Sequence, residues 1–241
     1  MLYFFRLHLF VLFTGLIGSA AAFAQGEEAL IRKNLKERMP QIQPIDEVKR
    51  TPMPGLFEIR VDGNEIYYTD ATGNFLMQGQ LIDTRTQRNL TDERLQKITS
   101  IDFKTLPIKD AITTVRGNGE RKLAVFADPN CGYCKRFERD LAKLDNITVY
   151  LFLYPILGKD SQDKSKAIWC AKDQVKSWQD WMLHDQTPAT ATCDTAALKR
   201  NLDFGQKYKI SGTPTSLFAD GTRLPGAIDM AQLEKQLGKR P

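Results

Sequence analysis

The sequence predicts an α+β protein in two parts: a small strand-rich N-terminal unit and a larger C-terminal α/β unit. Two patterns carry this prediction. In Leu56–Val61 apolar and charged residues alternate, as in a strand with one buried face. From Ile108 onward, continuous apolar runs alternate with segments of helical periodicity, which indicates parallel strands joined by helices. The 241 residues, 42% of them hydrophobic, are enough for two modest domains with buried cores.

The charge pattern excludes one class of function. The chain carries a formal net charge of +5, but its basic and acidic residues are interleaved rather than clustered. Interleaved charges are typical of solvated helix faces, so we expect no nucleic acid as a partner.

The first 24 residues have the pattern of a secretion signal. Arg6 precedes the apolar run Leu9–Ile17, and Ala22-Phe23-Ala24 is a small-x-small cleavage motif. The run is shorter than the roughly 20 apolar residues that span a bilayer. We therefore expect cleavage after Ala24 and an exported, soluble mature protein; an uncleaved N-terminal anchor is the alternative.

The N-terminal unit is predicted as one helix and a three-strand meander. Pro40 ends the helix, and the side chains of Phe57, Ile59 and Val61 share one face of the first strand. The last strand contains Gly79 and lies at an open edge, so its segment 75–81 is our candidate for a subunit contact. The predicted elements are a helix at 27–39 and strands at 56–61, 65–69 and 75–83.

A helix from Thr91 to about Phe103 connects the two units. Leu95, Ile98 and Ile101 recur at helical spacing, and Pro107 follows the segment. A helical connector is stiff, so it would hold the two units at a fixed separation.

The C-terminal unit is predicted to contain a βαβ unit with parallel strands. Asp229 is the predicted N-cap of the closing helix. The predicted strands are 111–115, 122–127, 147–154, 215–219 and 222–225, and the predicted helices are 135–144, one or two within 161–183, 195–208 and 229–237.

The four cysteines indicate disulfide chemistry. In an oxidising compartment two pairs are natural, Cys131 with Cys134 and Cys170 with Cys193. A zinc site with four thiolate ligands is the rival, but the wide spacing of the second pair fits it poorly. We therefore expect no metal and no cofactor.

Cys131-Gly132-Tyr133-Cys134 is the candidate active site. It follows a predicted strand and opens a predicted helix, where free amides and the helix dipole favour a thiolate over a thiol. The thiolate is the form that attacks disulfides. Cys131 is therefore assigned as the attacking thiol and Cys134 as the resolving one, with an inert disulfide or half of a zinc site as the alternatives.

Residues Phe126 to Cys134, together with Gly212-Thr213-Pro214-Thr215, resemble the thioredoxin superfamily. With Ala167 to Lys172 and the N-terminal strand unit, the chain from Gln25 onward resembles periplasmic DsbC-type disulfide isomerases. The resemblance implies a homodimer joined through cystatin-like N-terminal domains, a thioredoxin-like catalytic domain with a helical insertion, and reduction by a DsbD-type membrane partner.

The resemblance also implies roles for individual residues. Thr213 and Pro214 match a cis-proline loop that binds an extended substrate, and Cys170 and Cys193 match a structural disulfide. It divides the chain into a signal peptide (1–24), a dimerisation domain (25–89), a linker helix (90–107) and a catalytic domain (108–241).

Two groups common at such sites are missing. Thioredoxins carry a buried acid six positions before the first cysteine, where this chain has Val125. His184 is the one histidine after the predicted cleavage site, and we expect it on the surface rather than at the site.

The expected function is isomerisation of non-native disulfides in misfolded exported proteins of the periplasm. A net thiol oxidase of the DsbA type is an alternative, although such proteins resemble a single thioredoxin domain without an N-terminal strand unit. The other alternative is a chaperone that binds unfolded chains independently of its cysteines.

Overall fold

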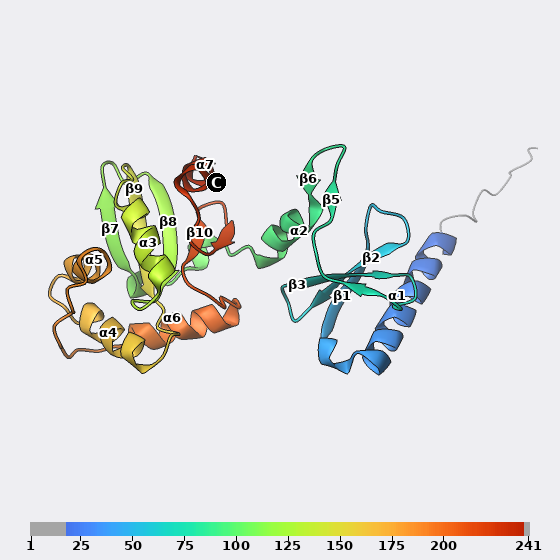
Figure 1. Cartoon of the computed structure of the whole chain (residues 1–241), viewed down its shortest axis with the longest axis horizontal. Coiled ribbons are helices and arrows are strands. Elements are labelled where there is room, and N and C mark those ends of the chain that lie inside the picture. Colours follow the sequence, from blue (N-terminus) through green and yellow to red (C-terminus); the bar gives the residue numbers. More distant parts are fainter. Residues whose placement is uncertain (1–17, 239–241) are drawn as a thin grey trace, which may run out of the picture. The chain divides into compact units, whose positions relative to one another are not determined.

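The computed structural model describes residues 18–238, which divide between Thr91 and Asp92 into two compact units (Figure 1). The first 17 residues of the predicted signal peptide, including Arg6, lie outside the described residues. Within residues 18–238, none of the helices combines the length and the apolar character needed to cross a bilayer.

In the N-terminal unit, helix α1 (Gly18–Arg38) packs on a four-stranded antiparallel sheet of order β1-β2-β3-β4. Ile31 and Leu35 of α1 are buried against Phe57, Ile59 and Val61, so the predicted inward face of that strand is confirmed. The strands are β1 (Ile45–Arg50), β2 (Leu56–Val61), β3 (Glu65–Asp70) and β4 (Leu76–Met77).

Two features of this sheet differ from the prediction. Strand β1 was not predicted, because its sequence IDEVKR carries four charged residues and no strict alternation. The predicted strand 75–83 is broken: β4 is short, and β5 (Ile82–Asp83) leaves the sheet to pair with β6 (Arg88–Asn89). Gly79 lies at the break, where the lack of a side chain weakens a strand.

The connecting helix α2 (Leu90–Thr99) is shorter than predicted. Ser100 and Ile101 both donate to the carbonyl of Gly221, which ends the helix before Phe103. Ile101 is buried in the core of the C-terminal unit, so its helical spacing with Ile98 was misleading.

The C-terminal unit contains a five-stranded sheet of order β11-β10-β8-β9-β7. Strands β8 (Arg121–Ala127) and β9 (Ile147–Leu153) are parallel and joined by α3 (Gly132–Leu141), so the predicted βαβ unit is confirmed. The antiparallel strands are β7 (Ile112–Arg116), β10 (Thr215–Phe218) and β11 (Arg223–Pro225).

Four further helices complete this unit, and both faces of the sheet are covered. Helices α3, α5 and α7 contribute to the core on one face, and Phe126, Phe152 and Phe204 stack on the other. Asp229 caps α7 by accepting from the Gln232 amide at 2.8 Å, as predicted. The helices are α4 (Lys159–Trp169), α5 (Gln174–His184), α6 (Ala196–Lys207) and α7 (Met230–Leu237).

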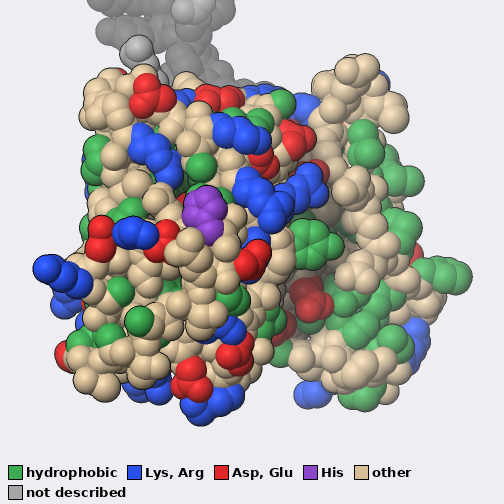
Figure 2. Space-filling model, turned by 60° about the vertical axis from the view of Figure 1, so that its left-hand side comes forward, with side chains coloured by type: hydrophobic (Ala, Val, Ile, Leu, Met, Phe, Trp, Pro, Cys, Tyr) green, Lys and Arg blue, Asp and Glu red, His purple; other side chains and the backbone are tan. Residues whose placement is uncertain are grey.

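The register of the central pair fixes where loops meet. Ala127 of β8 pairs with Leu153 of β9, so both strands end at the same edge of the sheet. The turn into α3 and the loop into α4 therefore start side by side. On the face seen in Figure 2, acidic and basic side chains lie interspersed. Helices α4, α5 and α6 each carry an ion pair one helical turn apart, such as Lys159 with Asp163 in α4.

Candidate functional site

Cys131 is the N-cap residue of α3. Its backbone is extended, and its Sγ atom accepts from the amide of Cys134 at 3.2 Å, which uses one of the amides left free at a helix start. Cys131 is 5% exposed and Cys134 is 2% exposed, and both are free thiols. The predicted position of the motif between a strand and a helix is thus found in the structure.

The loop containing Thr213 and Pro214 lies against Cys131. The Thr213–Pro214 peptide bond is cis, and the Cys131 thiol donates to the Thr213 carbonyl at 3.3 Å. The pairing of β10 with β8, with Thr215 opposite Phe126, holds the loop there. The structure therefore brings together residues that are 82 positions apart.

Gly132 and Tyr133, the two residues between the cysteines, face open space, whereas the two sulfur atoms are buried. A Cβ atom added to Gly132 would meet nothing within 4 Å, so space is open above the start of α3. Tyr133 is 68% exposed. The motif therefore presents an open, partly aromatic surface directly beside a covered thiol.

Burial sets the chemistry of Cys134. Desolvation raises the pKa of its thiol well above the ordinary value, and the hydrogen bond with Cys131 raises it further. Contacts with Asp128 and Thr213 act in the opposite direction but are weaker. Cys134 therefore carries its proton at neutral pH, which is compatible with the resolving role predicted for it from the sequence.

Asp128, which was not predicted as a site residue, organises the turn before Cys131. Its carboxylate is fully buried and accepts from the Asn130 amide at 2.8 Å, the Ser161 hydroxyl at 2.7 Å and the Leu157 amide at 2.9 Å. It thus ties together the ends of β8 and β9 and the start of α4. Its position before Pro129, directly ahead of the motif, was the one available sequence signal.

The buried acid that is missing at Val125 has no counterpart on β8, but α3 carries one. Glu138 is buried and accepts from Trp178 Nε1 at 3.0 Å. Burial raises the pKa of its carboxyl, while the Trp178 hydrogen bond and the nearby Arg116 lower it. His184 is exposed at the end of α5, as predicted.

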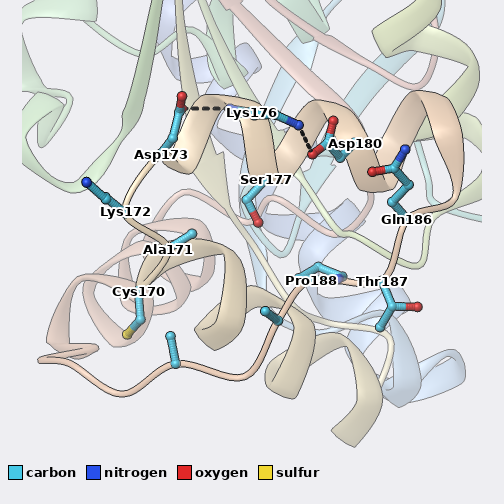
Figure 3. Close-up of a pocket in the computed structure, with 12 residues that line it drawn as sticks. Cys170, Ala171, Lys172, Asp173, Lys176, Ser177, Asp180, Gln186, Thr187 and Pro188 are labelled. Atoms are coloured by element: carbon cyan, nitrogen blue, oxygen red, sulfur yellow. Dashed lines mark hydrogen bonds and ion pairs between the residues drawn. The ribbon is translucent and has the colours of Figure 1, made fainter.

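Cys170 and Cys193 form a disulfide within the helical insertion. Beside the disulfide lies a groove of about 470 Å³ between helix α5 and the loop that follows α5 (Figure 3). Lys176 lies in this groove between Asp173, which accepts from its amide, and Asp180, which pairs with its ammonium group. Neither Cys131 nor Cys134 lines it, so the groove is separate from the two free thiols.

The disulfide also bears on the zinc alternative. Two of the four sulfurs that such a site would need are bonded to each other. Over the range 18–238, the structure has no group of three or more His, Cys, Asp or Glu side chains that could hold a metal ion.

Comparisons with known proteins match both units of the chain. A model of a thioredoxin-like domain matches residues 108–241, and a model of the disulfide bond isomerase protein N-terminal domain matches residues 20–92. The "Probable thiol:disulfide interchange protein DsbC" of Bordetella pertussis is 47% identical over 79% of this chain and 67% of its own length. The "Thiol:disulfide interchange protein DsbC" of Escherichia coli K12 is 30% identical over 90% of this chain and 89% of its own.

The comparison with solved structures includes one that is similar in both fold and sequence. A disulfide interchange protein from Neisseria gonorrhoeae is 38% identical, with a TM-score of 0.52, over 55% of this chain and 96% of its own.

Proposed function

Because the chain belongs to the DsbC family of thiol:disulfide interchange proteins, we propose that Cys131 and Cys134 perform its exchange chemistry. The family makes the chain a thiol-disulfide oxidoreductase of the isomerase type. We further propose a residue for each step of the reaction, and a substrate and partners for the protein.

The first step is attack by the Cys131 thiolate on one sulfur of a non-native disulfide. A bond forms between Cys131 and that sulfur, the substrate disulfide breaks, and the second substrate sulfur leaves as a thiolate. That thiolate attacks another disulfide of the substrate, and a later substrate thiolate displaces Cys131. Electrons balance without a co-reactant, because the number of disulfides does not change.

A second route ends the reaction when rearrangement stalls. Cys134 attacks the mixed disulfide, which releases a reduced substrate and leaves a Cys131–Cys134 disulfide. Two electrons have then passed to the substrate, so the protein needs a dithiol reductant to regain its active form. We propose a membrane reductase of the DsbD type for this step.

The observation that carries the proposal is the position of Cys131 Sγ. It accepts from a helix N-terminal amide at 3.2 Å and lies 3.3 Å from the Thr213 carbonyl. The first contact favours negative charge on the sulfur. The second sets the sulfur beside backbone that an extended substrate segment could pair with, as in other cases of β-strand addition.

Membership of the family supports a proposal for the partners and the location. We propose misfolded exported proteins with disulfides as substrates, the periplasm as the compartment, and export through a signal peptide cleaved after Ala24. Residues 25–89 would form the dimerisation domain, 90–107 the linker and 108–241 the catalytic domain. Phe75, Met77 and Ile82 are exposed apolar side chains on and near β4, which supports a subunit contact there.

The N-terminal unit favours an isomerase over a net oxidase. Residues 20–92 match a domain model named for disulfide bond isomerases. The redox state in cells separates the two functions: alkylation of freshly extracted protein should find the cysteines of an isomerase reduced, whereas a mainly oxidised pool would indicate an oxidase.

Substitution of the cysteines tests the assignment. Cys131→Ser should abolish the recovery of a scrambled disulfide protein, and Cys134→Ala should accumulate mixed disulfides that are visible on non-reducing gels. A Cys170→Ala/Cys193→Ala variant serves as the control that loses two other sulfurs. If Cys131→Ser still unscrambles the substrate, the proposed site is wrong.

A further inference from the structure

Trp181 reaches from the helical insertion to the active-site turn. It lies on α5, and its Nε1 atom donates to the carbonyl of Pro129 at 2.6 Å, two residues before Cys131. Fifty-two positions of sequence separate donor and acceptor. The backbone that delivers Cys131 to the start of α3 is thus held from outside by a side chain of another helix.

The same indole holds two lysines. Lys135 Nζ lies 4.0 Å from the centre of the Trp181 rings and Lys164 Nζ lies 4.7 Å from it. Both distances are within the range of a cation–π interaction. Lys135 directly follows Cys134 on α3, and its amide donates to the Cys131 carbonyl at 3.1 Å. Lys164 comes from α4, so Trp181 joins three helices to the turn.

These lysines are unusually well covered. Their side chains are 19% and 17% exposed, although lysine side chains are generally among the most exposed. Ordering a lysine side chain costs up to about 2 kcal/mol of conformational entropy. Their contacts with the indole offset that cost, and the ammonium groups are therefore kept beside the active-site turn.

Negative groups near the turn oppose the two lysines only in part. Asp185 pairs with Lys135 and Asp160 with Lys164, but these carboxylates are 76% and 69% exposed, so water screens them more than it screens the lysines. The charge of the buried Asp128 carboxylate also disfavours a thiolate nearby, but its oxygens accept hydrogen bonds from three donors, which partly offset that charge. Cys134 carries a proton and no charge.

We propose that Trp181 is a positioning residue for disulfide exchange: it fixes the carbonyl of Pro129 and holds Lys135 and Lys164 beside the turn, so that Cys131 ionises more readily. The inference rests on the proposed role of Cys131. It gives the helical insertion a part in the chemistry, because α4 and α5 supply one lysine and the indole.

Two substitutions of Trp181 separate its contributions. Trp181→Phe keeps a ring for the lysines and loses the N–H donor, whereas Trp181→Leu loses both. Trp169→Phe and Trp169→Leu are the matched controls, because Trp169 also donates to a backbone carbonyl, that of Asp194 at 3.1 Å, away from the motif. All variants are made in a Cys134→Ala background, so that one reactive thiol is followed.

The readouts are the rate of Cys131 alkylation by iodoacetamide at pH 7 and the thiolate absorbance at 240 nm as a function of pH. We expect Trp181→Leu to slow alkylation about three- to tenfold and to move the absorbance midpoint upward by roughly 0.5–1 pH unit. Trp181→Phe should give a smaller change in the same direction. The Trp169 variants should stay within about twofold of the parent.

Lys135→Met keeps the proposal testable if a Trp181 variant fails to fold, because the indole and its hydrogen bond remain. It should also raise the absorbance midpoint. If Trp181→Leu and Lys135→Met both titrate and react as the parent does, the inference is overturned while exchange by Cys131 still stands. If Cys131→Ser retains full exchange activity, the proposed function itself fails, whatever the Trp181 variants do.

Discussion

The Cys131 thiol donates to the carbonyl oxygen of Thr213 at 3.3 Å, so one hydrogen bond connects the start of α3 with the loop before β10. A substrate segment that paired with this loop would lie next to the sulfur that attacks it. The contact is made by the protonated thiol and is lost when Cys131 ionises, which leaves the Cys134 amide as the donor to the thiolate.

Alkylation should distinguish the thiols of Cys131 and Cys134. Only a thiolate reacts quickly, and burial raises the pKa of Cys134. At pH 7.5 we expect Cys131 in a Cys134→Ala variant to react at least about tenfold faster than Cys134 in a Cys131→Ala variant. Mass spectrometry of quenched samples measures both rates. In 8 M urea the two rates should converge; equal rates in the folded proteins would contradict the assignment.

Stability should depend on pH through Glu138. Because its pKa in the folded state is raised above the ordinary value of 4.5, the folded protein binds more protons there than the unfolded chain does. The contribution of Glu138 to stability is therefore fully present at pH values below its ordinary pKa. It is lost as the pH rises through the pKa of Glu138 in the folded state.

Glu138→Gln removes this ionisation and keeps an oxygen for Trp178 Nε1. Urea unfolding should show the variant to be more stable than the parent at pH 8, with the difference shrinking toward pH 4. Glu120→Gln, at an exposed position, is the control and should show no such trend. A Glu138→Gln variant whose stability tracks that of the parent at every pH would argue against the effect.

Gly205 is required by the close approach of Tyr154. A Cβ atom on Gly205 would overlap the ring of Tyr154, and Tyr154 is buried and donates to the Ile210 carbonyl at 2.9 Å. We expect Gly205→Ala to lower the free energy of unfolding by about 1–3 kcal/mol through overpacking. Gly26→Ala, on helix α1 with nothing within 4 Å of its new Cβ, is the control for denaturant midpoints. A stable Gly205→Ala protein would mean that Tyr154 moves aside at little cost.

The Cys170–Cys193 disulfide should contribute stability and not exchange. It closes a loop with a sequence separation of 23 residues, and in the chain-entropy model its removal costs about 3 kcal/mol. We expect a Cys170→Ala/Cys193→Ala variant to unfold at lower urea but to unscramble disulfides at a rate within about twofold of the parent at low temperature. A large loss of rate in the folded variant would assign this disulfide a direct role.

Most of the C-terminal unit could be predicted, because the sequence patterns that indicate its strands and helices are local. The continuous apolar runs of β8 and β9 are long enough to indicate buried strands, and the spacing of Phe137, Leu141 and Leu144 indicates the buried side of the segment after the motif. Asp229 is recognisable as an N-cap from its side chain alone.

The features that were missed depend on contacts distant in sequence. Strand β1 owes its place to pairing with β2, because its own charged sequence gives no strand signal. Ile101 has helical spacing with Ile98, yet the pairing of its amide with Gly221 takes it into another core. The hydrogen bond from Trp181 to Pro129 spans 52 positions, and no periodicity predicts such a contact.

Strands β8 and β9 end at the same edge of the sheet, and this affects which segments can vary around Cys131 among related chains. Since Ala127 and Leu153 are neighbours, the segment that follows β9 begins next to the turn that carries Cys131. Exchange of the segment from the end of β9 to the start of α6 would therefore change the side chains around Cys131, while the sequence of residues 131–134 stays the same.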